Sequence, residues 1–516
     1  MPSKVYSAAV VGLDAKIIEV EVDTSYGLRH FSIVGLPDKA IEESKERVGA
    51  ALKSSKFQSP SHQPLRVLVN LAPADLKKEG SLFDLPIAIG FLLASKQIKV
   101  TPEKKLFVGE LSLEGKLRPV KGALAVALEA QKQGFQELIL PKANVLEATL
   151  AVPQNENLKI IGAESLKEVV DYLQGKIEIT AGKTSARDAP ENNVWEVDIG
   201  WIQGQEYAKR ALEIAAAGGH NILMTGPPGA GKSLLAKSIP SILPPLSFEE
   251  SLEVTKIYSV VGFLPVDQPL AIQRPFRAPH HTASEPALIG GGNPARPGEI
   301  TLAHRGVLFL DEFPEFHRDA LESLRQPLEE GKITILRSKQ MLTFPASFTL
   351  VAAANPCPCG YFGDKERECK CLTIQIQSYR KKLSGPLMDR MDIFVQVPQL
   401  NYEKLTAAKI NRESAEIRER VARARETQKT RLSRDNAVNF QRLINSQMSL
   451  PQIEKYCQVE SDSHSLLRKY VDAGRLSARG YHRTLKVART IADLAESEQI
   501  KKEHVSEALM YRIRED

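Results

Sequence analysis

The stretch NILMTGPPGAGKSLLAKSI at residues 221–239 decides the fold. An apolar run stands before a glycine-rich loop, and a helix-forming segment follows it. Backbone N–H groups of such a loop point inward at a phosphate, and the positive end of the following helix adds attraction. We therefore predict a strand, a phosphate-binding loop and a helix; a glycine-rich turn without a ligand is the alternative. The loop residues are Gly226, Pro227, Pro228, Gly229, Ala230, Gly231, Lys232 and Ser233.

Two carboxylates farther along the chain complete a predicted nucleotide site. Residues 307–310 read as a buried strand that ends in Asp311 and Glu312. In P-loop ATPases the loop lysine contacts the β- and γ-phosphates of ATP and the loop serine binds Mg²⁺, which assigns these roles to Lys232 and Ser233. We expect Asp311 to hold the Mg²⁺ shell and Glu312 to polarise the attacking water. The alternative is an exposed acidic pair at a strand end.

Four more residues are candidates for acting on the nucleotide. Asn355 ends the apolar run FTLVAAAN, and its amide can orient the same water, although a turn-forming Asn before Pro is the alternative. Arg390 follows where a motor core places the arginine that acts on the neighbouring subunit's nucleotide, which implies a ring; an ordinary surface arginine is the alternative. Arg479 is our candidate for sensing the γ-phosphate, with Arg483 as its competitor.

The chain is too long for one core and divides into four parts. Residues 1–175 alternate short apolar runs with helix-like segments, and the polar, turn-rich residues 176–193 read as a linker. Residues 194–400 alternate β-type runs with helical segments, as a parallel sheet covered by helices requires. Residues 401–516 carry apolar residues at spacings of three and four, which predicts helices. The predicted fold class is multidomain α/β and α+β.

Composition narrows the class of protein. Hydrophobic residues make up 42% and charged residues 26%, which is typical of soluble globular proteins. The longest apolar stretch, near residues 85–94, is too short to span a bilayer, so we expect no membrane span. Five cysteines and an N-terminus without a secretory pattern lead us to expect a cytoplasmic protein. The net charge of +6 permits nucleic-acid binding without demanding it.

Four of the five cysteines form two close pairs. Cys357 and Cys359 are separated by nine residues from the pair Cys369 and Cys371. Four thiolates match a tetrahedral structural Zn²⁺ site, although this pairing is tighter than the more familiar spacing with two intervening residues. Free thiols or two local disulfides are the alternatives, and a reducing compartment disfavours the disulfides. Cys457 stands alone, and we expect a buried or incidental thiol there.

Longer strings are more specific than any of these motifs. They are VGLPDKAIEESKERV at 34–48, VNLAPADLKKEGSLFDLPIAIG at 69–90, FRAPHHTAS at 276–284, GGGNPARPGEITLAHRGVLFLDEFPEF at 290–316, LRQPLEEG at 324–331, NPCPCGYFGD at 355–364 and SGPLMDRMD at 384–392. With them the whole chain resembles the ComM/YifB family of magnesium-chelatase-like AAA+ ATPases. The resemblance implies a P-loop AAA+ α/β core, an all-helical lid domain and a homohexameric ring that moves on DNA. The resemblance also implies a function in branch migration during natural transformation.

The resemblance also implies a Lon-protease-like N-terminal domain, because GELSLEGKLRPVKGALAVALEA at 109–130 is similar to a segment of Lon. Lon needs a serine and a lysine within hydrogen-bond reach. Those positions align with Leu82 and Leu124, which cannot do this chemistry, and Ser81 lies one residue off. We therefore expect a scaffold without protease activity. This domain and the cysteines favour the ComM/YifB family over two alternatives, a metal-chelatase motor subunit and a chaperone-like protein remodeller.

Two segments are candidates for DNA contact. The long stretch at 274–296, between the P-loop and the acidic pair, corresponds to an insert that faces the central pore in magnesium-chelatase-like motors. Arg274 and Arg277 are our candidates there, and a subunit-packing loop is the alternative. The segment EGKITILRSKQMLTFPASFTL at 330–350 reads as a β-hairpin with Arg337 and Lys339 at its tip. A basic tip suits a motor that follows phosphates without reading sequence, and an ordinary exposed turn is the alternative.

Overall fold

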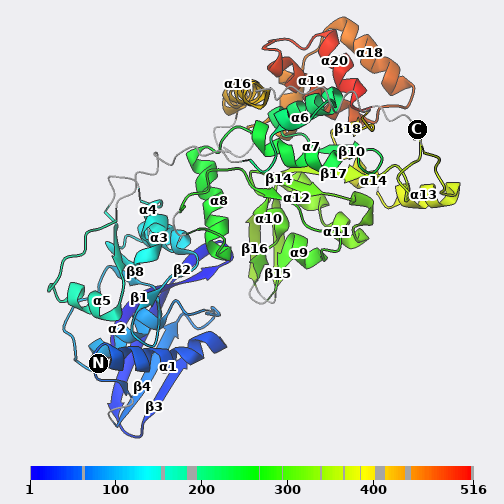
Figure 1. Ribbon diagram of the computed structural model, residues 1–516. Coiled ribbons are helices and arrows are strands. Elements are labelled where there is room, and N and C mark those ends of the chain that lie inside the picture. Colours follow the sequence, from blue (N-terminus) through cyan, green and yellow to red (C-terminus); the bar gives the residue numbers. More distant parts are fainter. Residues whose placement is uncertain are drawn as a thin grey trace. The chain divides into compact units, whose positions relative to one another are not determined.

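The computed structural model contains two compact units (Figure 1). Unit 1 consists of Met1–Pro190, Ser247–Ile272 and Asn293–Arg296; unit 2 consists of Glu191–Leu246, Gln273–Gly292 and Pro297–Asp516. The residues that the structure describes are 2–60, 64–78, 80–152, 157–182, 195–265, 268–292, 295–337, 340–363, 367–383, 385–400, 413–435 and 443–512. Within these ranges every helix is too short or too polar to cross a membrane. Most of the expected linker, residues 183–193, lies outside them.

A seven-stranded mixed sheet forms the centre of unit 1, in the order β3-β4-β2-β1-β5-β8-β9. Its strands are β1 (Ser3–Val11), β2 (Asp14–Tyr26), β3 (His30–Val34), β4 (Leu65–Ala72), β5 (Lys105–Phe107), β8 (Glu137–Pro141) and β9 (Lys159–Ala163). Strand β2 runs antiparallel to β1 and β4, whereas β5, β8 and β9 are parallel to their neighbours. A separate short pair joins β6 (Glu110–Leu111) to β7 (Leu117–Arg118).

Helices from two parts of the chain pack on this sheet. They are α1 (Lys39–Ser54), α2 (Asp84–Ala94), α3 (Ala123–Lys132), α4 (Val145–Thr149), α5 (Leu166–Leu173) and α8 (Phe248–Val261). Helix α2 is buried from Asp84 to Leu92, so it forms part of the core itself. Helix α8 comes from a later stretch of the chain and packs against α3, where the Gly122 N–H donates to the Ser259 carbonyl at 3.2 Å.

A five-stranded parallel sheet organises unit 2, in the order β11-β14-β17-β10-β18. Its strands are β10 (Ile222–Thr225), β11 (Phe276–Arg277), β14 (Val307–Leu310), β17 (Thr349–Ala354) and β18 (Ile393–Gln396). The parallel sheet confirms the prediction for this part of the chain. Because parallel strands end at the same edge, the residues that follow β10, β14 and β17 meet there. Strand β17 lies between the other two, although it comes last of the three in the sequence.

The remaining elements of unit 2 are mostly short helices and two hairpin-like pairs. The helices are α6 (Glu206–Gly218), α7 (Lys232–Ser238), α9 (Glu285–Ile289), α10 (Glu299–Leu302), α11 (Arg318–Glu322), α12 (Arg325–Glu330), α13 (Thr373–Lys381) and α14 (Gly385–Met388). The strand pairs are β12 (Gly290–Gly291) with β13 (Arg296–Pro297), and β15 (Lys332–Arg337) with β16 (Gln340–Pro345).

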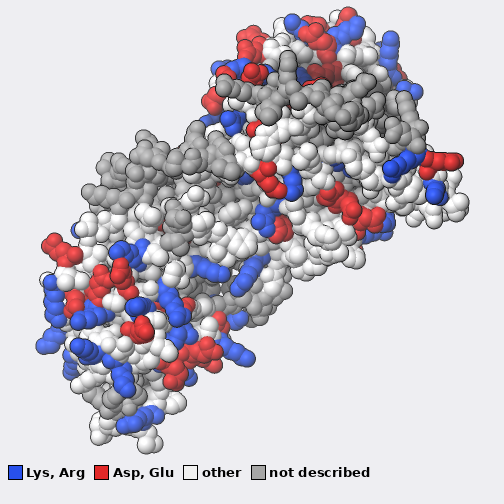
Figure 2. Space-filling model, in the orientation of Figure 1, with Lys and Arg blue, Asp and Glu red and all other residues white. Residues whose placement is uncertain are grey.

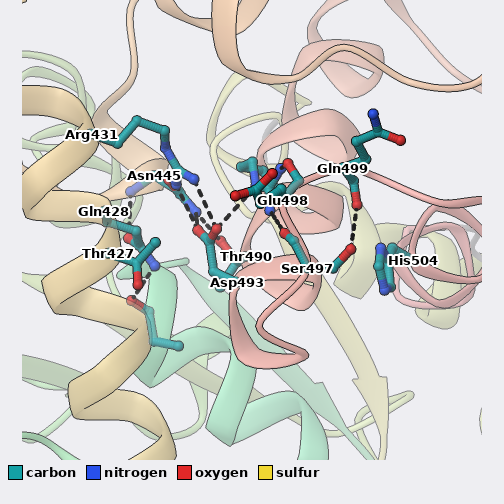
Figure 3. Close-up of polar contacts among 12 residues, drawn as sticks. Thr427, Gln428, Arg431, Asn445, Thr490, Asp493, Ser497, Glu498, Gln499 and His504 are labelled. Atoms are coloured by element: carbon teal, nitrogen blue, oxygen red, sulfur yellow. Dashed lines mark hydrogen bonds and ion pairs between the residues drawn. The ribbon is translucent and has the colours of Figure 1, made fainter.

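Helices make up the described C-terminal residues, as predicted. They are α16 (Glu413–Ser433), α17 (Leu450–Tyr456), α18 (Ser461–Asp472), α19 (Ala478–Leu494) and α20 (Lys502–Met510). Their apolar faces share one core with α6 and one side of the sheet. A buried polar network holds α19 in this core (Figure 3): Asp493 accepts hydrogen bonds from Arg431 at 2.7 Å and Asn445 at 2.8 Å, and Asn445 also donates to Thr490.

Candidate nucleotide site

The glycine-rich loop connects β10 to α7, as the sequence predicts. Helix α7 begins at Lys232, directly after Gly231, whose φ of 89° is in the left-handed region that favours glycine. At Gly226 a Cβ atom would lie 2.1 Å from the Val397 carbonyl oxygen, so only glycine fits there. Pro228 and Gly229 are exposed at the top of the loop. The loop is therefore shaped as a phosphate cradle that opens to solvent.

Lys232 lies buried beneath this loop. Its Nζ donates to the carbonyl oxygens of Gly226 at 2.6 Å and Pro227 at 2.9 Å, and to Oδ1 of Asn355 at 3.1 Å. Burial lowers the pKa of the Lys232 ammonium, and the nearby carboxylate of Asp311 opposes that shift. The structure thus brings Lys232 and Asn355 into direct contact, across 123 positions of sequence.

The acidic pair lies at the same edge of the sheet. Ser233 Oγ donates to Asp311 at 2.6 Å, which is the pairing expected of two Mg²⁺ ligands. Glu312 has a φ of 51°, an uncommon conformation for a residue other than glycine, and its carboxylate lies 3.0 Å from Nδ1 of His281. The donor chemistry of Ser233 and Asp311 suits Mg²⁺, because a hydroxyl and a carboxylate oxygen are hard ligands of the kind it prefers.

His281 is a site residue that sequence reasoning did not assign to the nucleotide. It follows β11, which pairs in parallel with β14 and therefore ends at the edge where Glu312 lies. The sequence does not reveal this position, because β11 has only two residues and its pairing with β14 cannot be recognised from so short a segment. The neighbouring ring of His280 lies 4.1 Å from that of His281, and His280 Nδ1 contacts Thr282.

The three candidate arginines line one open pocket of about 340 Å³ in unit 2. Arg390 is 8% exposed and pairs with Glu329; burial lowers its pKa, Glu329 opposes that shift, and Arg479 and Arg483 add to it. Arg483 pairs with Asp392, whereas the side chain of Arg479 is 67% exposed and lies 3.9 Å from Asp389. Among the described residues, the polar partners of these three arginines do not include the P-loop.

The four paired cysteines come together as a cluster. Their Sγ atoms all lie within 4.8 Å of one another, and those of Cys357, Cys359 and Cys369 are 3.3 to 3.6 Å apart. Tetrahedral Zn²⁺ with bonds of about 2.3 Å places sulfurs about 3.8 Å apart, so the cluster fits zinc. The sulfurs are too far apart for a disulfide, whose S–S bond is about 2.0 Å. Cys457 is buried away from the cluster, and burial raises the pKa of its thiol to about 12.

The predicted DNA contacts have different surroundings. Arg274 donates to the carbonyls of Pro244 and Arg305, both at 2.8 Å, and Arg277 forms a two-point ion pair with Glu299. These partners lie within the chain itself. The predicted hairpin is confirmed, since β15 pairs with β16 in a register that runs from Lys332–Pro345 to Arg337–Gln340. Lys339, and the intervening Ser338, lie outside the described residues.

Comparisons with known proteins account for nearly the whole chain. Residues 198–405 match the family described as magnesium chelatase, subunit ChlI; residues 20–144 match subunit ChlI of Mg-chelatase; and residues 411–512 match the ChlI C-terminal family. Competence protein ComM of Haemophilus influenzae is 43% identical over 516 residues, which cover 98% of this chain and 97% of that protein. The chain belongs to the ComM/YifB family of magnesium-chelatase-like AAA+ ATPases.

Two other relatives differ in how much of this chain they match. The YifB protein of Escherichia coli is 41% identical over 512 residues, with 99% of this chain and 97% of that protein covered. The magnesium-chelatase 38 kDa subunit of Cereibacter sphaeroides is 27% identical over 172 residues, which cover 30% of this chain and 51% of that subunit. The likeness to the ComM and YifB proteins thus includes unit 1, whereas the match to the chelatase subunit covers less than a third of the chain.

The two residues of unit 1 that the resemblance to Lon aligned with a Ser-Lys pair are apolar and lie in its core. Leu82 and Leu124 are 9% and 0% exposed and belong to the core. Ser81 donates its hydroxyl hydrogen bond to Glu110, not to a lysine. Lys78 is fully buried, but its Nζ donates to the carbonyl oxygens of Gly35, at 2.9 Å, and Pro73.

Proposed function

We propose that the protein is an ATP-dependent motor that assembles as a homohexamer, moves on DNA and promotes branch migration of recombination intermediates during natural transformation. The observation that carries the proposal is the convergence of Lys232, Ser233, Asp311 and Asn355 at one edge of a parallel sheet. Glu312 stands beside them. The DNA substrate rests on similarity to a competence protein across nearly the full length of both chains.

ATP hydrolysis follows from the chemistry of these residues. Lys232 would exchange its carbonyl partners for the β- and γ-phosphates, and Ser233 and Asp311 would hold Mg²⁺. When bound, Mg²⁺ neutralises charge that develops on the phosphates. Asn355 orients the attacking water, and Glu312 accepts its proton. Glu312 must first leave His281, which lies within hydrogen-bond distance of its carboxylate.

The ring is proposed from Arg390, Arg479 and Arg483. An open pocket with three guanidinium groups, none of them on the chain's own P-loop, suits a neighbouring subunit's triphosphate. Arg390 would release Glu329 and act on the neighbour's γ-phosphate, while Arg479, the most exposed of the three, senses it. Mixing Arg390→Ala with Lys232→Ala protein should restore some turnover at hybrid interfaces. If confirmed mixed rings never exceed the sum of the separate variants, the arginine does not act between subunits.

DNA contact is proposed for the β15–β16 hairpin, with Arg274 and Arg277 in the second segment. On the face shown in Figure 2, the described Lys and Arg side chains are intermixed with Asp and Glu. A local track therefore suits this chain better than a broad basic surface. Arg274 and Arg277 are occupied by internal partners, so contact by them requires those bonds to be exchanged. Arg337 ends β15, next to the tip of the hairpin.

The remaining parts support the motor. Zn²⁺ bound by the four cysteines is a structural metal, because a complete set of four thiolates leaves no open position for a substrate. Unit 1 is a Lon-like scaffold without a Ser-Lys pair, and the helices from α16 onward form the lid. Unpaired thiols this close together suit a reducing compartment, and we place the protein in the cytoplasm.

Strand exchange on synthetic three-strand and four-way DNA junctions tests the function. The purified protein should exchange the strands of these junctions only with ATP and Mg²⁺. The double variant Arg337→Ala with Lys339→Ala should weaken DNA binding equally for all sequences. The slope of the logarithm of the DNA-binding constant against the logarithm of the salt concentration should become less steep by the equivalent of up to about two phosphate contacts. Lys332→Ala, at the base of the same hairpin, is the matched control. If no DNA tested changes the rate of ATP hydrolysis, the DNA motor is rejected and the chelatase or protein-remodelling function is favoured.

A further inference from the structure

The cysteine cluster is built into the frame of the nucleotide site. Cys357 stands two residues after Asn355, whose side chain accepts a hydrogen bond from Lys232 at 3.1 Å. Cys371 stands two residues before α13, and Tyr379 of that helix lies close to the Asn355 backbone. Tyr379 is 6% exposed. The chain between Asn355 and Tyr379 is therefore a closed loop that begins and ends at the same nucleotide-site residue, with the four thiols inside it.

The same loop touches the phosphate-binding loop. Gly360, between the two cysteine pairs, has a φ of 87°, and a Cβ atom there would lie 2.4 Å from Cδ and 2.6 Å from Cγ of Pro228. Pro228 is one of the two exposed residues at the top of the P-loop. The Gly360 N–H donates to the Cys357 carbonyl at 2.9 Å, so a metal ligand fixes the turn that meets Pro228.

Among the described residues of the loop, few interactions are found besides those of the thiols. Three residues of the segment between the cysteine pairs, 364–366, lie outside the described residues. Apart from contacts of the sulfurs, the links of the described loop include the Gly360–Cys357 backbone hydrogen bond and two exposed side-chain contacts. The ring of Phe362 lies 5.3 Å from the Arg380 guanidinium, and Arg367 donates a hydrogen bond to Tyr361. Such exposed contacts are worth about 1 kcal/mol or less each. Four metal–thiolate bonds are far stronger, so metal occupancy decides whether this turn is fixed.

We propose that Zn²⁺ bound by Cys357, Cys359, Cys369 and Cys371 sets the affinity of the protein for ATP, because the metal fixes the turn at Gly360 against Pro228. This inference rests on the proposed zinc site and on the proposed use of ATP. A fixed turn holds Pro228 in place, so the P-loop stays open, and it maintains the hydrogen bond between Lys232 and Asn355. Loss of the metal would weaken both of these contacts at once.

The first test compares metal content with nucleotide affinity in the full chain. Zinc is measured by elemental analysis, and the Kd for a fluorescent ATP analogue is measured in excess Mg²⁺ before and after a zinc-selective chelator. We expect about one Zn²⁺ per chain and a Kd that rises about tenfold when it is removed, then recovers when Zn²⁺ alone is added back. Cys457→Ser is the control for removing a thiol outside the cluster, and its metal content and Kd should stay unchanged.

The second test separates the contact from the metal with two glycines of the same loop. Gly360 and Gly363 both have positive φ, of 87° and 78°, so alanine strains the backbone similarly at either position. Only at Gly360 would the new Cβ strike Pro228, because nothing lies within 4 Å of one at Gly363. Gly360→Ala should keep its zinc and melting temperature close to those of Gly363→Ala, yet raise the Kd for the ATP analogue about tenfold.

The outcomes distinguish this inference from the proposed function. If zinc is bound and its removal leaves the Kd unchanged, the coupling is wrong and the structural zinc site stands. If Gly360→Ala and Gly363→Ala bind the nucleotide equally, the contact with Pro228 is not the route. A purified protein without metal that binds ATP tightly would overturn both the zinc site and its coupling. A protein that keeps zinc but binds no ATP would instead reject the proposed motor.

Discussion

Two buried lysines, one in each unit, show how similar contacts can serve different purposes. Lys78 of unit 1 and Lys232 of unit 2 each donate to two backbone carbonyls, and burial lowers the pKa of both ammonium groups. Burial and pKa therefore do not distinguish them. The difference lies in what surrounds each ammonium and in whether its partners can be exchanged.

The partners of Lys78 belong to two separate segments of unit 1. Gly35 lies 43 residues away, and the backbone of Lys78 also bonds to the segment that follows Gly35, where its N–H donates to Leu36 at 3.2 Å. The partners of Lys232 are its own exposed loop and the side chain of Asn355. A phosphate can replace a loop carbonyl, whereas the ammonium of Lys78 is fully buried and joins two segments of unit 1. The first lysine holds the fold together, and the second is ready for a ligand.

Lys232→Ala should have the largest effect of the changes that test this contrast. Loss of the ammonium removes the charge that meets the β- and γ-phosphates, so ATP turnover should fall about a thousandfold, equivalent to about 4 kcal/mol. The melting temperature should change little, because two of the three partners of Lys232 are carbonyls of its own loop and do not join separate segments of the fold. Steady-state turnover and thermal melting of the same preparation check both statements. A large loss of stability would make Lys232 a structural lysine like Lys78.

Asp392→Asn tests a buried carboxylate that pairs with Arg483 and lies 3.5 Å from Nδ1 of His220. Burial alone would raise the pKa of Asp392, but Arg483 and His220 hold it well below the usual range. A depressed pKa stabilises the folded state above the unfolded pKa, near 4, and this contribution is lost as pH falls through the folded pKa. The variant should lose about 3 kcal/mol at pH 7, and the difference from wild type should shrink below about pH 4.

Denaturant unfolding across pH measures this effect. Asp389→Asn is the matched control, because its partner Arg479 is largely exposed and the pair should contribute little. A difference between wild type and Asp392→Asn that stays constant from pH 7 to pH 3 would mean that the carboxylate is not responsible.

Lys78→Met should lower the free energy of unfolding by about 2 kcal/mol, because the buried ammonium loses its hydrogen bonds to Gly35 and Pro73, which join two segments of unit 1. ATP turnover at a temperature where the variant is folded should equal that of wild type. Lys53→Met, at an exposed position of α1, controls for the loss of a charge. Turnover that falls with Lys78→Met, and not with Lys53→Met, would place unit 1 in the catalytic cycle and end the contrast between the two lysines.

The sequence predicted the parts of the site that depend on local pattern. The P-loop, the strand before Asp311, the strand before Asn355 and the β15–β16 hairpin all have a continuous apolar or alternating pattern, and each forms where expected. Two features depend on tertiary pairing instead. Strand β11 is too short to show a period, so the approach of His281 to Glu312 was hidden. Likewise, nothing local reveals that α8 packs in unit 1.

His281→Ala should have the smallest effect. A histidine that engages Glu312 competes with the water whose proton the carboxylate must accept, so its removal should raise basal ATP turnover, by up to about fivefold. The increase is limited because Glu312 is half exposed. His280→Ala is the matched control, since that ring contacts Thr282 and not the carboxylate. Lower turnover in His281→Ala would show that the histidine supports Glu312 instead of restraining it.

Helix α8 constrains how this protein can be cut or rearranged. The chain leaves unit 2 after Leu246, contributes α8 to unit 1 and returns at Gln273, so no single cleavage point separates the two units. A fragment that starts at residue 191 would retain α8 without α3, and would expose Val254 and Ile257, which are each 1% accessible in the intact chain. We expect such a fragment to aggregate. We therefore expect a relative that contains unit 2 without unit 1 to lack residues 247–272 or to cover the apolar face of α8 in another way.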